Sequence, residues 1–169
     1  STQTDGDTLF LNTGDGAEWD EVSLGPFTAI LRDAGTADLN CDGKADIYTT
    51  TSSGHSFWLN QANSWELNRL DTSTGGRSVD AGDFDRDGDS DMLITRASAS
   101  RVVWLENKLD AGQTWGQHEI GALNTANCAR FGDVDGDADL DAVAISETIH
   151  EVVLWKNLAT RPQRLLKSG

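Results

Sequence analysis

Three short segments of the chain are rich in aspartate, and their acidic side chains follow one spacing. Each segment has the form D-x-[D/N]-x-D-x-x-x-D, so side-chain oxygens stand at its first, third, fifth and ninth positions. In a tight loop, alternate positions turn three of these side chains to one side, and the ninth residue closes the group from the next strand. Ca²⁺ takes six to eight oxygen ligands at about 2.3–2.6 Å. The spacing therefore predicts calcium-binding loops.

Loop one covers residues 38–46, loop two residues 83–91 and loop three residues 133–141. The predicted ligands are the side chains at positions one, three, five and nine and the backbone carbonyl at position seven, with one Ca²⁺ for each loop and up to three in all. Position six is Gly in loops one and two, as a turn with positive φ favours. Ala138 takes that position in loop three, which predicts a strained or shifted turn. The predicted metal ligands are Asp38, Asn40, Asp42, Lys44, Asp46, Asp83, Asp85, Asp87, Asp89, Asp91, Asp133, Asp135, Asp137, Asp139 and Asp141.

Other interpretations of these loops are weaker. An EF-hand needs a bidentate Glu at position twelve and a helix on each side. Position twelve is Thr49, Ile94 or Ala144, and β-branched runs follow the loops. Mg²⁺ keeps several of its waters and rarely occupies an all-protein site. Solvated Asp-rich turns without an ion stay open as the alternative, above all for loop three.

The loops recur with the period of a structural repeat. They begin at residues 38, 83 and 133, and a Trp-containing segment follows each one, at 57–60, 103–106 and 154–157. A repeat of about 40–50 residues with several short strands is typical of propeller blades. Tryptophans that recur in register are expected to pack between blades rather than to bind sugars.

Alternating hydrophobic runs give the strands of one repeat. They predict strands over residues 77–83, 92–96, 101–106 and 115–120, joined by turns rich in Gly, Ser and Asp. No segment shows a helical period. The predicted fold class is all-β, built from propeller blades of four antiparallel strands.

Counting strands gives about three and a half blades in one propeller region, 1–169. A half blade covers residues 1–25, and blades cover about 26–72, 73–122 and 123–169, the last ending in a weak strand at 163–167. Closed propellers have four to eight blades. The chain is therefore expected to be part of a larger propeller, completed by further blades of the same or another chain.

The composition of the chain argues against several classes of binding partner. The formal net charge is -15 at pH 7, which repels nucleic acid and anionic membranes. No apolar run is long enough to span a bilayer, so we expect no membrane insertion. Cys41 and Cys128 form no C-x-x-C pair, and a bridge between them is not favoured.

Catalytic motifs are missing from the sequence. It contains no H-E-x-x-H, G-x-S-x-G, P-loop or Rossmann pattern. His55, His118 and His150 are isolated and are expected to be surface residues. We therefore expect no enzyme activity and no catalytic residues.

The loops and the strands that follow them (Asp91–Ile94, Asp141–Ile145) resemble the FG-GAP repeats of integrin α-subunit propellers and, more closely, bacterial VCBS-type repeats. That resemblance implies structural calcium on one face and a ligand on the opposite face. The ligand loops would be Ser52–Gly54, Ala97–Ser100, Ser146–His150, Asp71–Gly76 and Gly121–Asn127.

The expected function is a calcium-stabilised extracellular module, secreted or on the cell surface, for adhesion or other interaction with a protein or a glycan. The alternatives are the propeller part of a secreted carbohydrate-active enzyme of the lyase or dehydratase type, and a structural subunit of a surface fibre.

Overall fold

The computed structural model describes residues 7–12, 14, 16–25, 29–71, 75–108 and 114–158. The chain divides into two compact units, residues 1–30 and residues 31–169. Every regular element in the described residues is a β-strand, apart from a single 3-10 turn, Ala97–Ala99. The predicted all-β fold class is therefore confirmed.

The first unit contains one antiparallel pair of strands, β1 (Asp7–Asn12) and β2 (Trp19–Gly25). Asn12 accepts backbone hydrogen bonds from Gly14 and Gly16 at its Oδ1, at 2.6 and 3.2 Å, in the connection between the strands. The side chains of Phe10 and Trp19 are exposed.

The second unit contains three antiparallel sheets in which strands that follow one another in sequence are neighbours. The predicted strand at 163–167 lies outside the described residues. Sheet one has β3 (Leu31–Ala37), β4 (Asp46–Thr51), β5 (Gly54–Asn60) and β6 (Trp65–Asp71). Sheet two has β7 (Gly76–Gly82), β8 (Asp91–Arg96), β9 (Arg101–Asn107) and β10 (Trp115–Ala122). Sheet three has β11 (Ala126–Gly132), β12 (Asp141–Ser146) and β13 (Glu151–Trp155).

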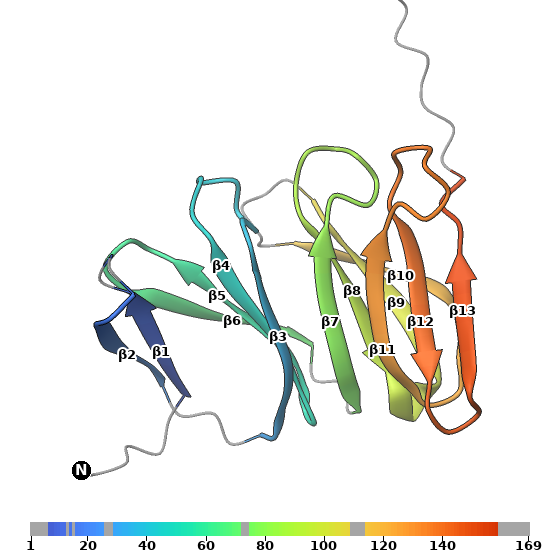
Figure 1. Ribbon diagram of the computed structural model, residues 1–169, viewed down its shortest axis with the longest axis horizontal. Helices are drawn as coiled ribbons and strands as arrows, with labels where there is room; N and C mark the ends of the chain where they lie inside the picture. The colour runs from blue at the N-terminus through green and yellow to red at the C-terminus, as the bar shows by residue number, and fades with distance from the viewer. Residues whose placement is uncertain are drawn as a thin grey trace, which may run out of the picture. The chain divides into compact units, whose positions relative to one another are not determined.

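The first strands of the three sheets, β3, β7 and β11, pack side by side (Figure 1). Side chains fix their relative positions. Asp33 Oδ2 accepts the backbone N–H of Val79 at 3.2 Å, and Asp80 Oδ2 accepts that of Phe131 at 2.8 Å. Arg130 Nη2 in β11 also donates to Asp33 Oδ2 at 3.1 Å. A repeated sheet whose first strands adjoin is the arrangement expected of propeller blades.

Two hydrophobic clusters fill the spaces between the sheets. The first joins sheet one to sheet two, and large side chains meet from both sides. The second joins sheet two to sheet three, and the third sheet contributes mostly alanine. The first cluster includes Tyr48, Phe57, Leu59, Met92, Ile94, Val103 and Leu105, and the second Leu93, Val102, Ala126, Ala129, Ala142 and Ala144.

One tryptophan departs from the register that the sequence indicates. Trp58 pairs with Ile47, and Trp155 pairs with Ala142, at the second residue of the strand after the loop. Trp104 instead pairs with Leu93, the third residue of β8, so it lies on the opposite face of its sheet. There it stacks on His118, with ring centroids 4.4 Å apart.

Two further expectations have outcomes in the structure. The expectation that all three histidines lie at the surface is wrong for His55, whose side chain is fully buried in β5. Cys41 and Cys128 are free thiols.

The described part of the chain has no helix with the length and hydropathy needed to cross a membrane.

Candidate metal-binding loops

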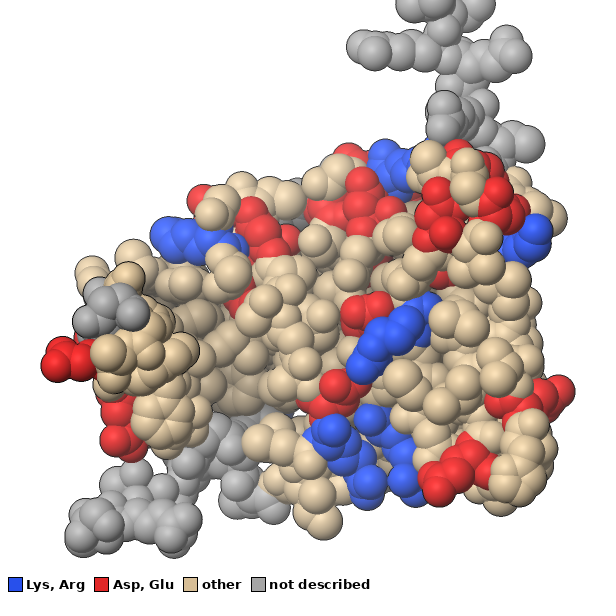
Figure 2. Space-filling model, in the orientation of Figure 1, with Lys and Arg blue, Asp and Glu red and all other residues tan. Residues whose placement is uncertain are grey.

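The three acidic loops occupy equivalent places in the three sheets. Each joins the first strand of a sheet to its second strand, β3 to β4, β7 to β8 and β11 to β12. All three therefore lie at the same end of the second unit, the upper end in Figure 1, where Figure 2 shows acidic side chains gathered.

The backbone of each loop enters the left-handed region twice. At position six the φ angles are 83° for Gly43, 104° for Gly88 and 69° for Ala138. Ala138 therefore adopts the turn that glycine adopts in the other loops, and strain at this position, as the sequence predicts, is the consequence. Position four is also left-handed, with φ 57° at Cys41 and 66° at Arg86. In loop three this position is Gly136, with φ 79°, which is the one sign of this second turn in the sequence.

Loops two and three each bring three carboxylates together. Oxygens of Asp83, Asp85 and Asp87 lie within 4.8 Å of one another in loop two. Oxygens of Asp133, Asp135 and Asp141 do the same in loop three. Like charges this close repel one another, and a cation removes that repulsion. Both groups could hold a metal ion.

Loop one differs in the surroundings of its carboxylates. Asp38 accepts backbone N–H groups of its own loop, as Asp133 does in loop three: Oδ1 accepts that of Asp42 at 3.1 Å and Oδ2 that of Gly43 at 2.8 Å. Asp42 Oδ2 forms an ion pair with Lys44 Nζ at 2.7 Å, and this hydrogen bond lowers the pKa of Asp42. Within the described residues, loop one does not bring three carboxylates as close as the other two loops do.

The aspartate at position nine closes every loop in the same way. One carboxylate oxygen accepts the N–H of the loop's second residue, and the other accepts the N–H of the asparagine at the end of, or just after, the third strand. The distances lie between 2.8 and 3.0 Å. The three sets are Asp46 with Leu39 and Asn60, Asp91 with Phe84 and Asn107, and Asp141 with Val134 and Asn157.

These closing aspartates are buried, with exposed fractions of 0–1%. Burial disfavours the charged carboxylate. It raises the pKa of Asp46, and it raises that of Asp91 to about 6. In loop three an oxygen of Asp141 also lies within 4.8 Å of oxygens of Asp133 and Asp135, whereas Asp91 is not among the three carboxylates gathered in loop two.

The asparagines that follow the third strand link neighbouring sheets. Asn107 Nδ2 donates to the carbonyl of Leu39 in loop one at 2.8 Å, and Asn157 Nδ2 donates to that of Phe84 in loop two at 2.9 Å. Loops one and two are therefore each held by the sheet that follows them. This link was not predicted, because it depends on which loops become neighbours in space.

Basic side chains neutralise part of the acidic end. Lys156 Nζ lies 3.1 Å from Asp135 Oδ2, and this hydrogen bond lowers the pKa of Asp135. Arg86 of loop two forms an ion pair with Asp139 of loop three. Asp139 and its equivalent Asp89 are both buried at position seven, for which the sequence predicts a carbonyl ligand.

Taken together, repeated antiparallel sheets with adjoining first strands and an acidic loop in each define a β-propeller-like repeat protein. Comparison with family models agrees with this class. Residues 38–94 and 83–144 each match the FG-GAP-like repeat, and the two matches together span more than half of the chain. The chain belongs to the FG-GAP-like repeat family. No curated protein matches it significantly.

Proposed function

We propose that this chain is a calcium-stabilised propeller module, secreted or at the cell surface, that binds a protein or a glycan and carries out no catalysis. The proposal rests on one observation, the two carboxylate trios of loops two and three at equivalent places in neighbouring sheets. Calcium accepts such oxygen-rich sites, and extracellular modules need only bind it at about 10⁻⁴–10⁻³ M.

The ions would have a structural role. Loops one and two contact the sheets that follow them through Asn107 and Asn157, so an ion that orders loop two also orders its contact with sheet three. With the calcium end occupied in this way, the opposite end of the sheets is free for a ligand.

A thermal melt tests the proposal. Calcium at 100 times its Kd adds about 2.7 kcal/mol for each site, which corresponds to about 5–10 °C in a chain of this size. We expect that rise with Ca²⁺ relative to EGTA and a much smaller one with Mg²⁺. Sedimentation in both conditions separates ion binding from assembly. Equal melting temperatures with calcium and with EGTA would exclude a structural role for the ion.

A further inference from the structure

Arginines collect at the end of the sheets opposite the acidic loops. Arg32 lies at the start of β3 and Arg77 at the start of β7, while Arg96 ends β8 and Arg101 begins β9. Figure 2 shows basic side chains at this lower end of the second unit, below the acidic loops. Four arginines therefore lie at one end of sheets one and two in a chain whose formal net charge is -15.

Pairing along the strands places these arginines at one end of neighbouring strands. Arg96 pairs with Gly76, the residue before Arg77, on one side and with Arg101 on the other. The bond between Asp33 and Val79 fixes β3 beside β7, which places Arg32 and Arg77 at the same end of adjacent strands. The four guanidinium groups therefore come from three strands of one sheet and the first strand of the sheet before it.

Two acidic groups of this region are already engaged. Arg101 Nε lies 2.9 Å from Glu119 Oε1, and Asp33 Oδ2 accepts from Arg130. Arg32 and Arg77 are exposed, and their side chains make no hydrogen bond or ion pair with any of the described residues. Two guanidinium groups thus remain available for carboxylate or sulfate, which they bind with paired hydrogen bonds.

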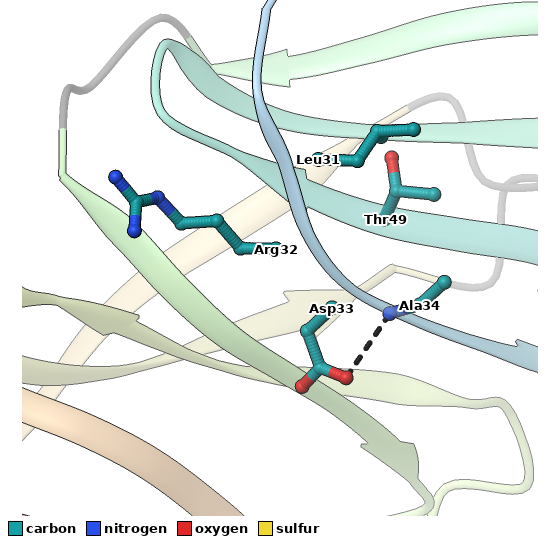
Figure 3. A pocket seen from close by; sticks show the side chains of 5 residues that line it. All are labelled: Leu31, Arg32, Asp33, Ala34 and Thr49. Atoms are coloured by element: carbon teal, nitrogen blue, oxygen red, sulfur yellow. Dashed lines mark hydrogen bonds between the residues drawn. The ribbon is translucent and has the colours of Figure 1, made fainter.

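A hollow of about 380 Å³ runs along β3 beside Arg32, lined by Leu31, Asp33, Ala34 and Thr49 as well. Figure 3 shows Arg32 extending to one side of β3, with Leu31 and Thr49 on the other side of the strand. Thr49 is 5% exposed, and its Oγ1 has no hydrogen-bond partner among the described residues. A buried hydroxyl without a partner is costly unless a ligand or water supplies one.

We propose that this end of the sheets binds an acidic polysaccharide, with a sugar carboxylate on Arg32 and Arg77 and a sugar hydroxyl on Thr49. A single small anion would meet only the guanidinium groups. A chain of carboxylated sugars can lie along β3 and meet both sides of the strand, and its ring faces suit the apolar wall of Leu31 and Ala34. This inference rests on the proposed function and specifies its ligand class.

Binding can be measured by calorimetry on the calcium-loaded chain. The probes are a short oligomer of glucuronic acid, a glucose oligomer of the same length and a poly-glutamate peptide. We expect binding of the uronic acid oligomer, weakened by salt, and at least about tenfold weaker binding of the other two, since each charge-assisted or sugar-specific contact is worth about that factor. Equal binding of the neutral oligomer would overturn the role of charge, and tighter binding of poly-glutamate would assign the site to an acidic protein instead.

Variants locate the site. The double substitution Arg32→Gln with Arg77→Gln is expected to weaken uronic acid binding about tenfold or more, and Thr49→Val to weaken it less while leaving poly-glutamate binding unchanged. Lys108→Gln is the matched control, because it removes an exposed positive charge just after β9, at the end that holds the acidic loops. Equal loss in this control would show that only net charge matters.

The calcium melt separates the two proposals. If the variants keep the calcium-dependent rise in melting temperature but the unmodified chain binds no uronic acid oligomer, the ligand assignment is wrong and the calcium module stands. If the unmodified chain shows no calcium-dependent rise, the proposed function fails whatever the sugar binding.

Discussion

The guanidinium of Arg86, at position four of loop two, forms an ion pair with the carboxylate of Asp139, at position seven of loop three. Asp139 is 5% exposed and the Arg86 side chain is only partly accessible, so solvent screens this pair weakly. The pair joins sheet two to sheet three at the end where the metal ions are proposed. Order in one acidic loop is therefore linked to order in the next.

Replacing Arg86 should destabilise the contact between these sheets. Breaking a fully buried pair by removing one partner costs about 3–5 kcal/mol. Because Arg86 is partly exposed, we expect Arg86→Met to lower the free energy of unfolding by about 1–3 kcal/mol. Urea unfolding in excess calcium measures this change. The double substitution Arg86→Met with Asp139→Asn removes the uncompensated charge and should recover part of the loss, and no recovery would argue against the pair.

Cys41 holds position four in loop one, where loop two has Arg86, so a positive charge can be introduced there instead of removed. Burial and the carboxylates of Asp38, Asp89 and Asp87 raise the pKa of its thiol, and Asn107 of sheet two bonds to the same loop at Leu39. Cys41→Arg would place a cation beside Asp89 as Arg86 does beside Asp139. We expect a gain of up to about 1 kcal/mol, measured by urea unfolding. Cys41→Gln has similar length without charge, and an equal gain there would show that the charge is not responsible.

Much of this arrangement could be predicted from local sequence. The strands predicted at residues 77–83, 92–96, 101–106 and 115–120 correspond to β7–β10 within two residues at each end. Alternating hydrophobic residues and Asp- and Gly-rich turns are local signals. Because the sequence repeats, the same signals occur in each of the three repeats. Ala138 was singled out by the same comparison, and its φ of 69° agrees.

Features that depend on neighbouring sheets could not be predicted in this way. Trp104 follows the sequence pattern of Trp58, yet it stands three residues before its closing asparagine, Asn107, whereas Trp58 stands two residues before Asn60. The closing asparagines occupy equivalent positions in the sheets, so Trp104 lies on the opposite face of its sheet from that of Trp58. Likewise, the ion pair between Arg86 and Asp139 cannot be predicted without knowing that loops two and three are adjacent.

Replacing Ala138 by glycine should relieve the backbone strain in the turn of loop three. Left-handed backbone costs a non-glycine residue roughly 1–2 kcal/mol, part of which glycine returns through its greater freedom in the unfolded chain. Ala138→Gly is therefore expected to stabilise the chain by about 1 kcal/mol. Gly43→Ala is the matched reversal at position six of loop one, where a Cβ would meet no atom within 4 Å, and it should destabilise by a similar amount. Denaturant midpoints compare the two, and a loss of stability in Ala138→Gly would contradict the strain.

Asp91 should make the calcium-free chain sensitive to pH. Burial raises its pKa to about 6 in the folded state, against about 3.9 in an unfolded chain. Between these values the folded chain binds more protons, so the contribution of Asp91 to stability is present at low pH and is lost as pH rises through about 4 to 6, by at most about 1.4 kcal/mol per pH unit. An NMR titration of the aspartate carboxyl carbons in chelator should show one midpoint near 6. Calcium should lower that midpoint, and a midpoint below 4 in chelator would contradict the effect of burial.

Asp85 is the central carboxylate of the trio in loop two, and its removal should abolish one ion site. With Asp85→Ala, two carboxylates remain near each other, which is too few charged oxygens to hold Ca²⁺ against its hydration. Equilibrium dialysis should therefore show one fewer calcium per chain, together with a smaller calcium-dependent rise in melting temperature. Glu151→Ala is the control, since it removes one exposed carboxylate at the start of β13, away from the loops. An unchanged calcium count in Asp85→Ala, or an equal loss in the control, would mean that the ions associate with the acidic surface as a whole and not with the loop that the repeat defines.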